Sequence, residues 1–284
     1  MRFSRQRYQW RLRETELPLG TRTMIMGVLN VGPEDSAKGL DPDVALDRAL
    51  ELQEQGADLI DVNIGAITLG SEHTPPKEEL RRMVPVLRKL RHNLTAPLSV
   101  NTYNADTAER ALELGVQVIN DVSGLSIDPR LAKVVGQSNA GLILTHLRAA
   151  PSSGGKLPPV PDLINLIGRD LKSAIDRALG AGIDRRRIVI DPGLELGKRG
   201  LENYGILSGL DRFAALGQPV LISPSRKLFL TETLRASEEA WIFGAAAAVT
   251  VGICAGAHIV RVHDVDAMVQ VAKVADRFQE LQSE

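Results

Sequence analysis

Eight short apolar segments recur along this chain, and each is followed by a stretch with a helical pattern. They lie at residues 23–30, 59–64, 98–101, 117–121, 141–146, 187–191, 220–223 and 258–263. Short continuous apolar runs are typical of strands buried on both faces, and their alternation with helices makes the strands parallel. Eight such units in 284 residues predict a closed (β/α)8 barrel. An open, doubly wound sheet is the alternative that this pattern leaves.

The chain shows no internal boundary. No linker rich in glycine and serine, and no block of like charge, divides it. We therefore expect a single barrel domain at residues 23–284, preceded by an N-terminal extension at residues 1–22. The extension is basic and lacks the apolar core of a secretory signal. The longest uncharged apolar run, residues 242–257, is too short to span a membrane, and we expect it to form a buried helix.

Net charge and cysteine usage limit the kind of partner. The formal net charge is -1 at pH 7, which gives no whole-protein field to attract nucleic acid or a membrane. The only cysteine, Cys254, lies in an apolar stretch and fits a reducing compartment. We therefore expect a cytoplasmic protein that binds small molecules through placed side chains. The basic run at residues 185–187 is expected to be a solvated surface.

Polar side chains stand at nearly every predicted strand end. They are Asn30, Asp61 with Asn63, Asn101, Asn120 with Asp121, His146, Asp191, Ser225 with Arg226 and Lys227, and Arg261 with His263. In a barrel of this type the active site lies at the carboxyl ends of the strands. Any one of these residues could instead cap the helix that follows it, and His146 fits better as a hydrogen-bonded core residue. Together they favour a polar site.

The residue types at these ends suit two binding tasks. Arg261 and His263 alternate with valines, so they share one face of their strand. Together with Lys227 they form a cationic group that could hold an anion. Carboxylate and amide groups such as Asp191 and Asn120 can pair with adjacent N–H donors of a flat heterocycle.

Candidate metal ligands are few. The side-chain oxygen of Asn30 suits a hard cation such as Mg²⁺, which prefers oxygen and usually keeps several waters. The chain has no His-x-x-x-His pair and no Cys-x-x-Cys pair. We therefore expect no dedicated zinc or iron site.

Five stretches of the chain resemble motifs of the dihydropteroate synthase family. They are Met26-Gly27-Val28-Leu29-Asn30-Val31-Gly32-Pro33, Ile119-Asn120-Asp121-Val122, Asp191-Pro192-Gly193 with Gly197-Lys198, Ser225-Arg226-Lys227, and Arg261-Val262-His263-Asp264-Val265, in the family's order over residues 23–275. The resemblance implies the same barrel, commonly as a homodimer. It also implies a transferase of folate biosynthesis, which joins 6-hydroxymethyl-7,8-dihydropterin diphosphate to 4-aminobenzoate and releases diphosphate with Mg²⁺ present.

The resemblance also implies roles for particular residues. The implied catalytic residues are Lys227, Arg261 and His263; the implied substrate-binding residues are Asn101, Asn120, Asp191 and Ser225; the implied metal ligand is Asn30. In this family the C–O bond to diphosphate breaks largely before the amine attacks. The site would therefore stabilise a leaving dianion and a pterin cation.

Four departures from the family pattern lie around the same site. The first loop, at residues 32–39, lacks the family's phenylalanine, and the second, at residues 63–70, lacks its arginine. Asn101 stands where the family has an aspartate, which replaces a permanent acceptor with a neutral group that can also donate. The family's Asp-Pro-Gly-Phe-Gly-Phe-Gly-Lys segment here carries Leu194-Glu195-Leu196 in place of Phe-Gly-Phe.

These departures leave three hypotheses open. The first is a divergent synthase. The second is a pterin-binding homologue without synthase activity, because the altered loops would cover the second substrate. The third is a pterin-dependent methyltransferase-type protein, since Asp61-Val62-Asn63-Ile64-Gly65 resembles the Asp-x-Asn-x-Gly of such enzymes. The Ser-Arg-Lys and Arg-Val-His-Asp-Val motifs weigh against the third, because a methyltransferase does not need them.

Overall fold

A computed structural model describes residues 5–32, 40–65, 74–148, 157–225, 227–231, 234 and 237–283. Most of the two departing loops lies outside these described residues, at positions 33–39 of the first loop and 66–70 of the second, and so does Arg226. What the structure shows of the site therefore comes from strand ends and from the loops after the later strands.

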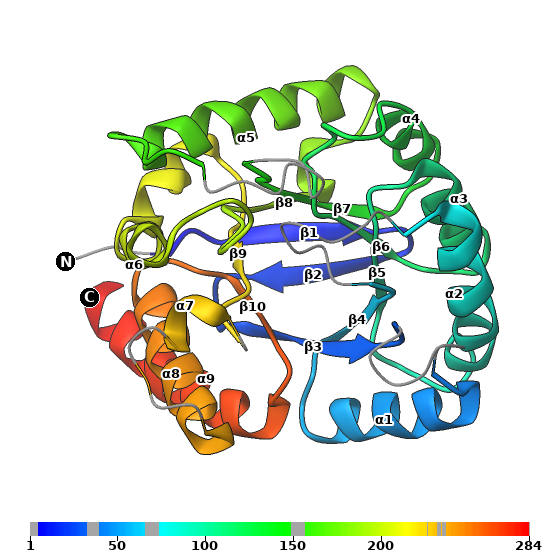
Figure 1. Cartoon of the computed structure of the whole chain (residues 1–284), viewed down its shortest axis with the longest axis horizontal. Coiled ribbons are helices and arrows are strands. Elements are labelled where there is room, and N and C mark those ends of the chain that lie inside the picture. The colour runs from blue at the N-terminus through cyan, green and yellow to red at the C-terminus, as the bar shows by residue number, and fades with distance from the viewer. Residues whose placement is uncertain are drawn as a thin grey trace.

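The barrel contains eight parallel strands and nine α-helices among the described residues (Figure 1). The strands are β3 (Met24–Asn30), β4 (Leu59–Asn63), β5 (Leu98–Asn101), β6 (Val118–Asp121), β7 (Gly141–Thr145), β8 (Ile188–Asp191), β9 (Leu221–Ile222) and β10 (Ile259–Val262). The helices are α1 (Pro42–Glu54), α2 (Pro76–Leu90), α3 (Ala105–Glu113), α4 (Arg130–Gln137), α5 (Leu163–Gly180), α6 (Gly200–Ser208), α7 (Leu228–Thr231), α8 (Glu238–Cys254) and α9 (Val265–Ser283).

The sheet closes on itself. Its strand order runs from β8 through β7, β6, β5, β4, β3 and β10 to β9. The two outer strands meet through a parallel bridge between Ile190 and Val220, and the Ile190 N–H donates to Pro219 O at 3.0 Å. The predicted (β/α)8 barrel is therefore confirmed, and the doubly wound alternative is wrong.

Alternation along each strand divides its side chains between two apolar clusters. In β3, for example, Ile25 and Leu29 join the cluster between the strands and the surrounding helices. Met24 and Met26 point the other way, into the barrel interior. Because both faces are buried, the strands are continuously apolar until they reach the mouth, where polar residues take over.

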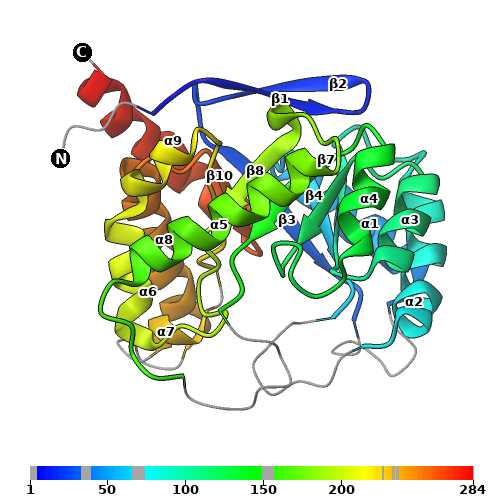
Figure 2. The same cartoon turned by 90° about the horizontal axis from the view of Figure 1, so that it is seen from above.

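A β-hairpin closes the amino-terminal end of the barrel. Its antiparallel strands, β1 (Tyr8–Leu12) and β2 (Thr15–Leu19), lie across that end (Figure 2). Trp10 and Leu12 are fully buried in the interior cluster, and the indole N–H of Trp10 donates to Arg187 O at 3.0 Å. A Cβ at Gly141 would lie 2.4 Å from Leu12, so only glycine permits this approach. Any substrate site must therefore lie at the opposite end.

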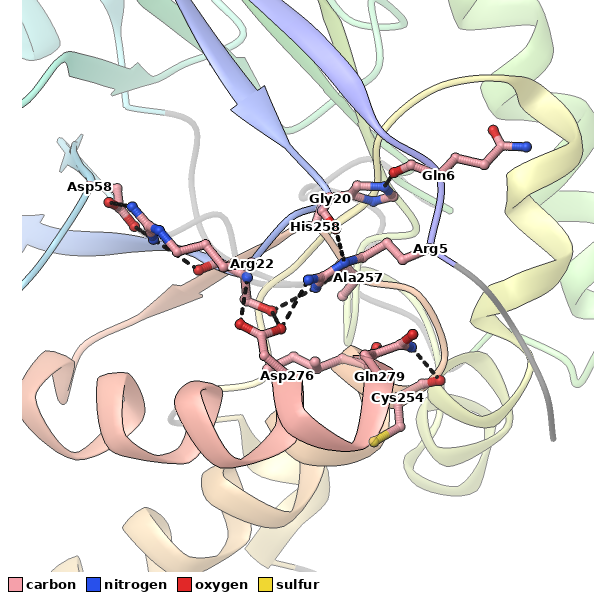
Figure 3. Close-up of polar contacts among 12 residues, drawn as sticks. Arg5, Gln6, Gly20, Arg22, Asp58, Cys254, Ala257, His258, Asp276 and Gln279 are labelled. Atoms are coloured by element: carbon pink, nitrogen blue, oxygen red, sulfur yellow. Dashed lines mark hydrogen bonds and ion pairs between the residues drawn. The ribbon is translucent and has the colours of Figure 1, made fainter. Parts of the chain in front are cut away.

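Charged contacts hold the segment before the hairpin in place (Figure 3). The Arg5 guanidinium donates to Thr23 Oγ1 and Ala257 O, both at 2.8 Å, and to Asp276 Oδ1 at 2.9 Å. Asp276 on α9 also accepts the Thr23 N–H at 2.7 Å. The N-terminal segment is thus joined to the start of β3 and to the last helix.

Two expectations about the exterior need correction. Arg187 is buried rather than solvated, because its guanidinium donates to Val135 O and Ala140 O, both at 2.7 Å. The apolar run at residues 242–257 forms most of α8, but only one face of that helix is buried: Phe243 is 63% exposed and Val251 46%. No helix in the described part of the chain has the length and apolarity needed to cross a membrane.

Candidate active site

Four neighbouring strands carry an asparagine at the same level of the barrel, as the last residue of β3, β4 and β5 and the penultimate residue of β6. Asn30 pairs in register with Asn63, Asn63 with Asn101, and Asn101 with Asn120. Residues in register on adjacent strands point to the same face, and these four alternate with residues of the helix-side cluster, so they face the barrel axis. We call these four residues the asparagine row. Asn63 Nδ2 donates to Asn30 Oδ1 at 2.8 Å within it.

Asp61 lies two residues before Asn63 on β4 and links that strand to three others. Its carboxylate is fully buried and accepts Arg261 Nε at 2.7 Å, Ser99 Oγ at 2.5 Å and Asn120 Nδ2 at 3.2 Å. The Arg261 side chain is only 11% exposed. Asp61 therefore fixes the orientation of two predicted site residues that come from opposite parts of the sequence.

Two buried polar atoms beside Asp61 have no partner among the described residues. They are Asn120 Oδ1 and Arg261 Nη2. The Asn120 amide cannot be turned around, because that would place its oxygen against the Asp61 carboxylate. An unsatisfied buried donor or acceptor costs about 1–3 kcal/mol. A ligand that bonds to both atoms would remove this cost, because Asn120 Oδ1 offers an acceptor and Arg261 Nη2 a donor.

Asp191 and Lys198 brace the turn after β8. Asp191 is buried and its Oδ1 accepts the Gly193 N–H at 2.7 Å. Burial raises the pKa of Asp191, against the opposing effects of this N–H and of the Lys198, Lys227 and Arg261 charges. Lys198 Nζ donates to Gly193 O and to His146 O at 2.5 and 2.8 Å, and burial lowers its pKa to about 7.

Lys227 lies near the same carboxylate. Burial lowers its pKa, the nearby negative charges of Glu195 and Asp191 oppose that effect, and the positive charge of Arg261 adds to it. The predicted pterin and anion residues therefore share one electrostatic environment.

Ser225 and His263 join the ends of β9 and β10. The Ser225 hydroxyl oxygen accepts the His263 N–H at 3.2 Å and lies 3.2 Å from His263 Nδ1. Because the oxygen already accepts the backbone N–H, its proton can be donated to Nδ1 of a neutral imidazole. Ser225 is buried, so this contact holds the two loops together from within.

Two residues at strand ends have structural roles instead. The Asp121 carboxylate accepts the Ser123 N–H and hydroxyl and the Leu125 N–H, at 2.8, 2.7 and 2.5 Å, which folds the loop before α4. Burial raises its pKa to about 6. His146 Nε2 lies 3.1 Å from Asp170 Oδ2, and burial lowers the pKa of His146 to about 2, so its ring is neutral.

The site contains two residues to which sequence reasoning assigned no role in it. Asp61 was at a predicted strand end, and its spacing of two from Asn63 already placed it on the inward face. Glu195 lies in the turn after β8 with a backbone φ of 68°, in the left-handed region. A non-glycine residue there costs about 1–3 kcal/mol. The signal in the sequence was a glutamate in a segment where the family pattern has glycine.

The described residues offer limited metal-binding capacity. They contain no group of three or more His, Cys, Asp or Glu side chains that could hold a metal ion. Asn30 Oδ1 accepts one hydrogen bond from Asn63 and keeps a second lone pair. That single neutral oxygen fits Mg²⁺, which is commonly held by one or two protein ligands together with substrate phosphates.

Comparison with known proteins places this barrel among the pterin-binding enzymes. The family described as "Pterin binding enzyme" matches residues 26–263. The dihydropteroate synthase of Synechocystis sp. is 34% identical over 267 residues, which cover 93% of this chain and 92% of that protein. The chain belongs to the dihydropteroate synthase family and is a transferase.

Solved structures agree with this assignment. A Clostridium difficile dihydropteroate synthase, determined in the presence of pteroic acid, has a TM-score of 0.85 and 36% sequence identity. The match covers 91% of this chain and 97% of that one. A Xanthomonas albilineans dihydropteroate synthase with 4-aminobenzoic acid has a TM-score of 0.85 and 34% identity, with 97% and 99% of the two chains covered.

Proposed function

We propose that this protein condenses 6-hydroxymethyl-7,8-dihydropterin diphosphate with 4-aminobenzoate and releases diphosphate. The observation that carries the proposal is the buried pair of unpartnered atoms, Asn120 Oδ1 and Arg261 Nη2, on side chains that both contact Asp61, together with the Asp191 carboxylate on which the Arg261 charge also acts. An acceptor, a carboxylate and a cationic donor at the mouth of one barrel match a flat heterocycle with N–H groups that is linked to an anion. Solved relatives were determined in the presence of pteroic acid and with 4-aminobenzoic acid.

The pterin would lie against the carboxylate and amide groups. Asp191 accepts two parallel N–H bonds from the ring edge, and Asn120 Oδ1 accepts a third. Asn101, next to Asn120 in register, supplies a neutral amide to the same ring. Lys227 donates to a ring acceptor on the side nearest Asp191.

The diphosphate would lie against the cationic groups. Arg261 presents Nη2 while Asp61 holds its Nε, so the guanidinium is already oriented when the leaving group develops charge. His263 and Lys227 lie on neighbouring strand ends, and Asn30 Oδ1 would hold Mg²⁺. When bound, the ion would neutralise part of the negative charge of the diphosphate. As the C–O bond breaks, the electron pair leaves with diphosphate, and the amine nitrogen then bonds to the pterin methylene carbon and loses a proton.

A direct assay tests this function. Purified protein is mixed with the pterin diphosphate, 4-aminobenzoate and Mg²⁺, and diphosphate release is followed with and without the amine. Amine-dependent release with formation of dihydropteroate is expected. No turnover despite micromolar binding of the pterin diphosphate would favour a pterin-binding homologue without synthase activity.

Asn101→Asp is expected to raise activity. The aspartate restores a permanent acceptor beside a pterin that becomes positive, which is worth about 1–3 kcal/mol. That gain corresponds to an increase in kcat/KM of about 5- to 150-fold. The matched control is Asn63→Asp, which adds the same charge one strand away but places it against Asn30 Oδ1. Steady-state kinetics should show the gain at position 101 only, and an equal or lower kcat/KM for Asn101→Asp would contradict the expected role.

We also propose that the protein is a homodimer formed through α8 and α9. The exposed face of α8 carries Phe243 and Val251, and apart from Glu238 and Glu239 this helix has no charged residue. The neighbouring α9 exposes Val274, Phe278 and Leu281, at 60%, 53% and 71%. A helix that is apolar on all sides is normally buried. A second copy of the same surface would cover both helices.

Val251→Glu is expected to produce monomers. In a two-fold interface each substitution appears twice, so two buried carboxylates would oppose association. Val44→Glu on α1 is the matched control, because Val44 is 43% exposed and Val251 46%. Light scattering after size exclusion should give a dimer for the wild type and for Val44→Glu. A monomeric wild type, or a dimeric Val251→Glu, would exclude this interface.

A further inference from the structure

The turn after β8 holds a glutamate in a conformation that favours glycine. Gly193, Glu195 and Gly197 have φ values of 70°, 68° and 78°. The Glu195 N–H donates to Asn203 Oδ1 at 2.8 Å, and the Lys198 N–H donates to Glu195 O at 3.2 Å. Asn203 is fully buried. The surrounding structure therefore fixes this strained backbone, and strain kept at a site mouth points to a task for the side chain.

The Glu195 side chain reaches the segment that carries Lys227. Its Oε1 accepts the Phe229 N–H at 2.6 Å, in the first turn of α7. Phe229 is buried and packs edge-on against Tyr204, with ring centroids 5.1 Å apart. At the other end of the segment, Ser225 is bonded to His263. Lys227 therefore lies between two anchors, two residues from each.

Charge gives a second link between Glu195 and Lys227. Burial works against the charged form of Lys227, and so does the positive charge of Arg261. Glu195 contributes the largest effect in the opposite direction and Asp191 a smaller one. Lys198 is also close enough to interact electrostatically with Lys227, whose positive charge lowers the pKa of Lys198. The carboxylate of Glu195 thus raises the pKa of Lys227, whereas burial and the charge of Arg261 lower it.

We propose that Glu195 is a positioning residue that, from the turn after β8, fixes the segment carrying Lys227 and places a carboxylate near its ammonium group at the pterin site. It acts through two separable contacts: hydrogen-bond acceptance from Phe229 N–H, which fixes the backbone, and negative charge, which favours the ammonium. The inference rests on the proposed function, in which Lys227 contacts the pterin. It explains why a strained glutamate occupies a position where the family pattern has glycine.

Two substitutions separate these contacts. Glu195→Gln keeps an oxygen for the Phe229 N–H and removes only the charge. Glu195→Gly removes both contacts and relieves the backbone strain. Arg13→Gly is the control for strain relief, because Arg13 has a φ of 44° in the hairpin turn at the opposite end of the barrel.

The main readout is the pH dependence of Lys227 acylation in the ligand-free protein, followed by mass spectrometry. Because only the neutral amine reacts, the midpoint reports the Lys227 pKa without any need for turnover. Both Glu195 variants are expected to lower this midpoint by about one pH unit. Arg13→Gly should leave it unchanged.

Kinetics provide the second readout. In Glu195→Gly, kcat/KM for the pterin diphosphate is expected to fall about tenfold or more, although the thermal midpoint does not fall. Glu195→Gln should lose less. An unchanged Lys227 midpoint in both variants, or an unchanged kcat/KM in Glu195→Gly, would overturn the proposal. If the wild type shows no turnover, the proposed function fails, while the acylation midpoints still decide the role of Glu195.

Discussion

Asp61→Ala is expected to lower the free energy of unfolding by about 3–5 kcal/mol, because it leaves the Arg261 guanidinium buried without its partner charge. The Asp61 carboxylate is fully buried, and the Arg261 side chain is only 11% exposed, so water cannot replace the lost contact. Ser99 and Asn120 lose an acceptor at the same time. Chemical denaturation followed by circular dichroism measures the change.

A double substitution separates the stranded charge from the lost packing. Arg261→Met removes the charge and keeps much of the side-chain volume, so Asp61→Ala with Arg261→Met should be more stable than Asp61→Ala alone. Recovery of about 1–3 kcal/mol is expected. A free energy of unfolding for Asp61→Ala within 1 kcal/mol of the wild type would show that the pair is not a buried ion pair.

The contact between Asp61 and Arg261 shows which part of the site the sequence could not predict. Arg261 was predicted to face the site from the alternation of its strand, and Asn120 from its place at a strand end. Their common partner is separated from Arg261 by 200 residues and from Asn120 by 59. Local periodicity states which face a residue occupies but not which residue it meets across a barrel. The sequence therefore predicts that Asp61 is a carboxylate near a strand end, but it does not predict that Asp61 orients Arg261 and Asn120.

Other parts of the fold also divide into features that local sequence patterns predict and features that depend on contacts between distant residues. The barrel followed from strand and helix periods, which are local properties of the chain. The hairpin that closes the barrel depends on Trp10 meeting Gly141 and Arg187, and these contacts span more than 100 residues. Glu195 was hidden for a different reason. Local propensity predicts a left-handed backbone at glycine and not at glutamate, so the signal at Glu195 was its departure from the glycine of the family pattern and not its own residue type.

Lys227→Ala is expected to reduce kcat/KM by about 10²–10³-fold while the protein remains folded. The substitution removes a cation from a site in which Asp191 and Arg261 stay in place. Lys172→Ala is the matched control, because Lys172 is an exposed lysine on α5 whose ion pair, with Asp176, lies within its own helix. Steady-state kinetics with the pterin diphosphate should show full activity for the control. Full activity in Lys227→Ala would refute the proposed pocket.

The pH profile of the wild type tests the same assignment from another direction. Lys227 must be protonated to donate, and burial lowers its pKa, so activity should fall as pH rises through that lowered value. Asp191 must be ionised to accept, and burial raises its pKa, so activity should fall as pH decreases through that raised value. The two limbs should therefore lie closer together than those of a free lysine and a free aspartate. In Lys227→Ala the alkaline limb should disappear from the residual activity, whereas the acid limb should stay, because Asp191 is still buried and still accepts the Gly193 N–H.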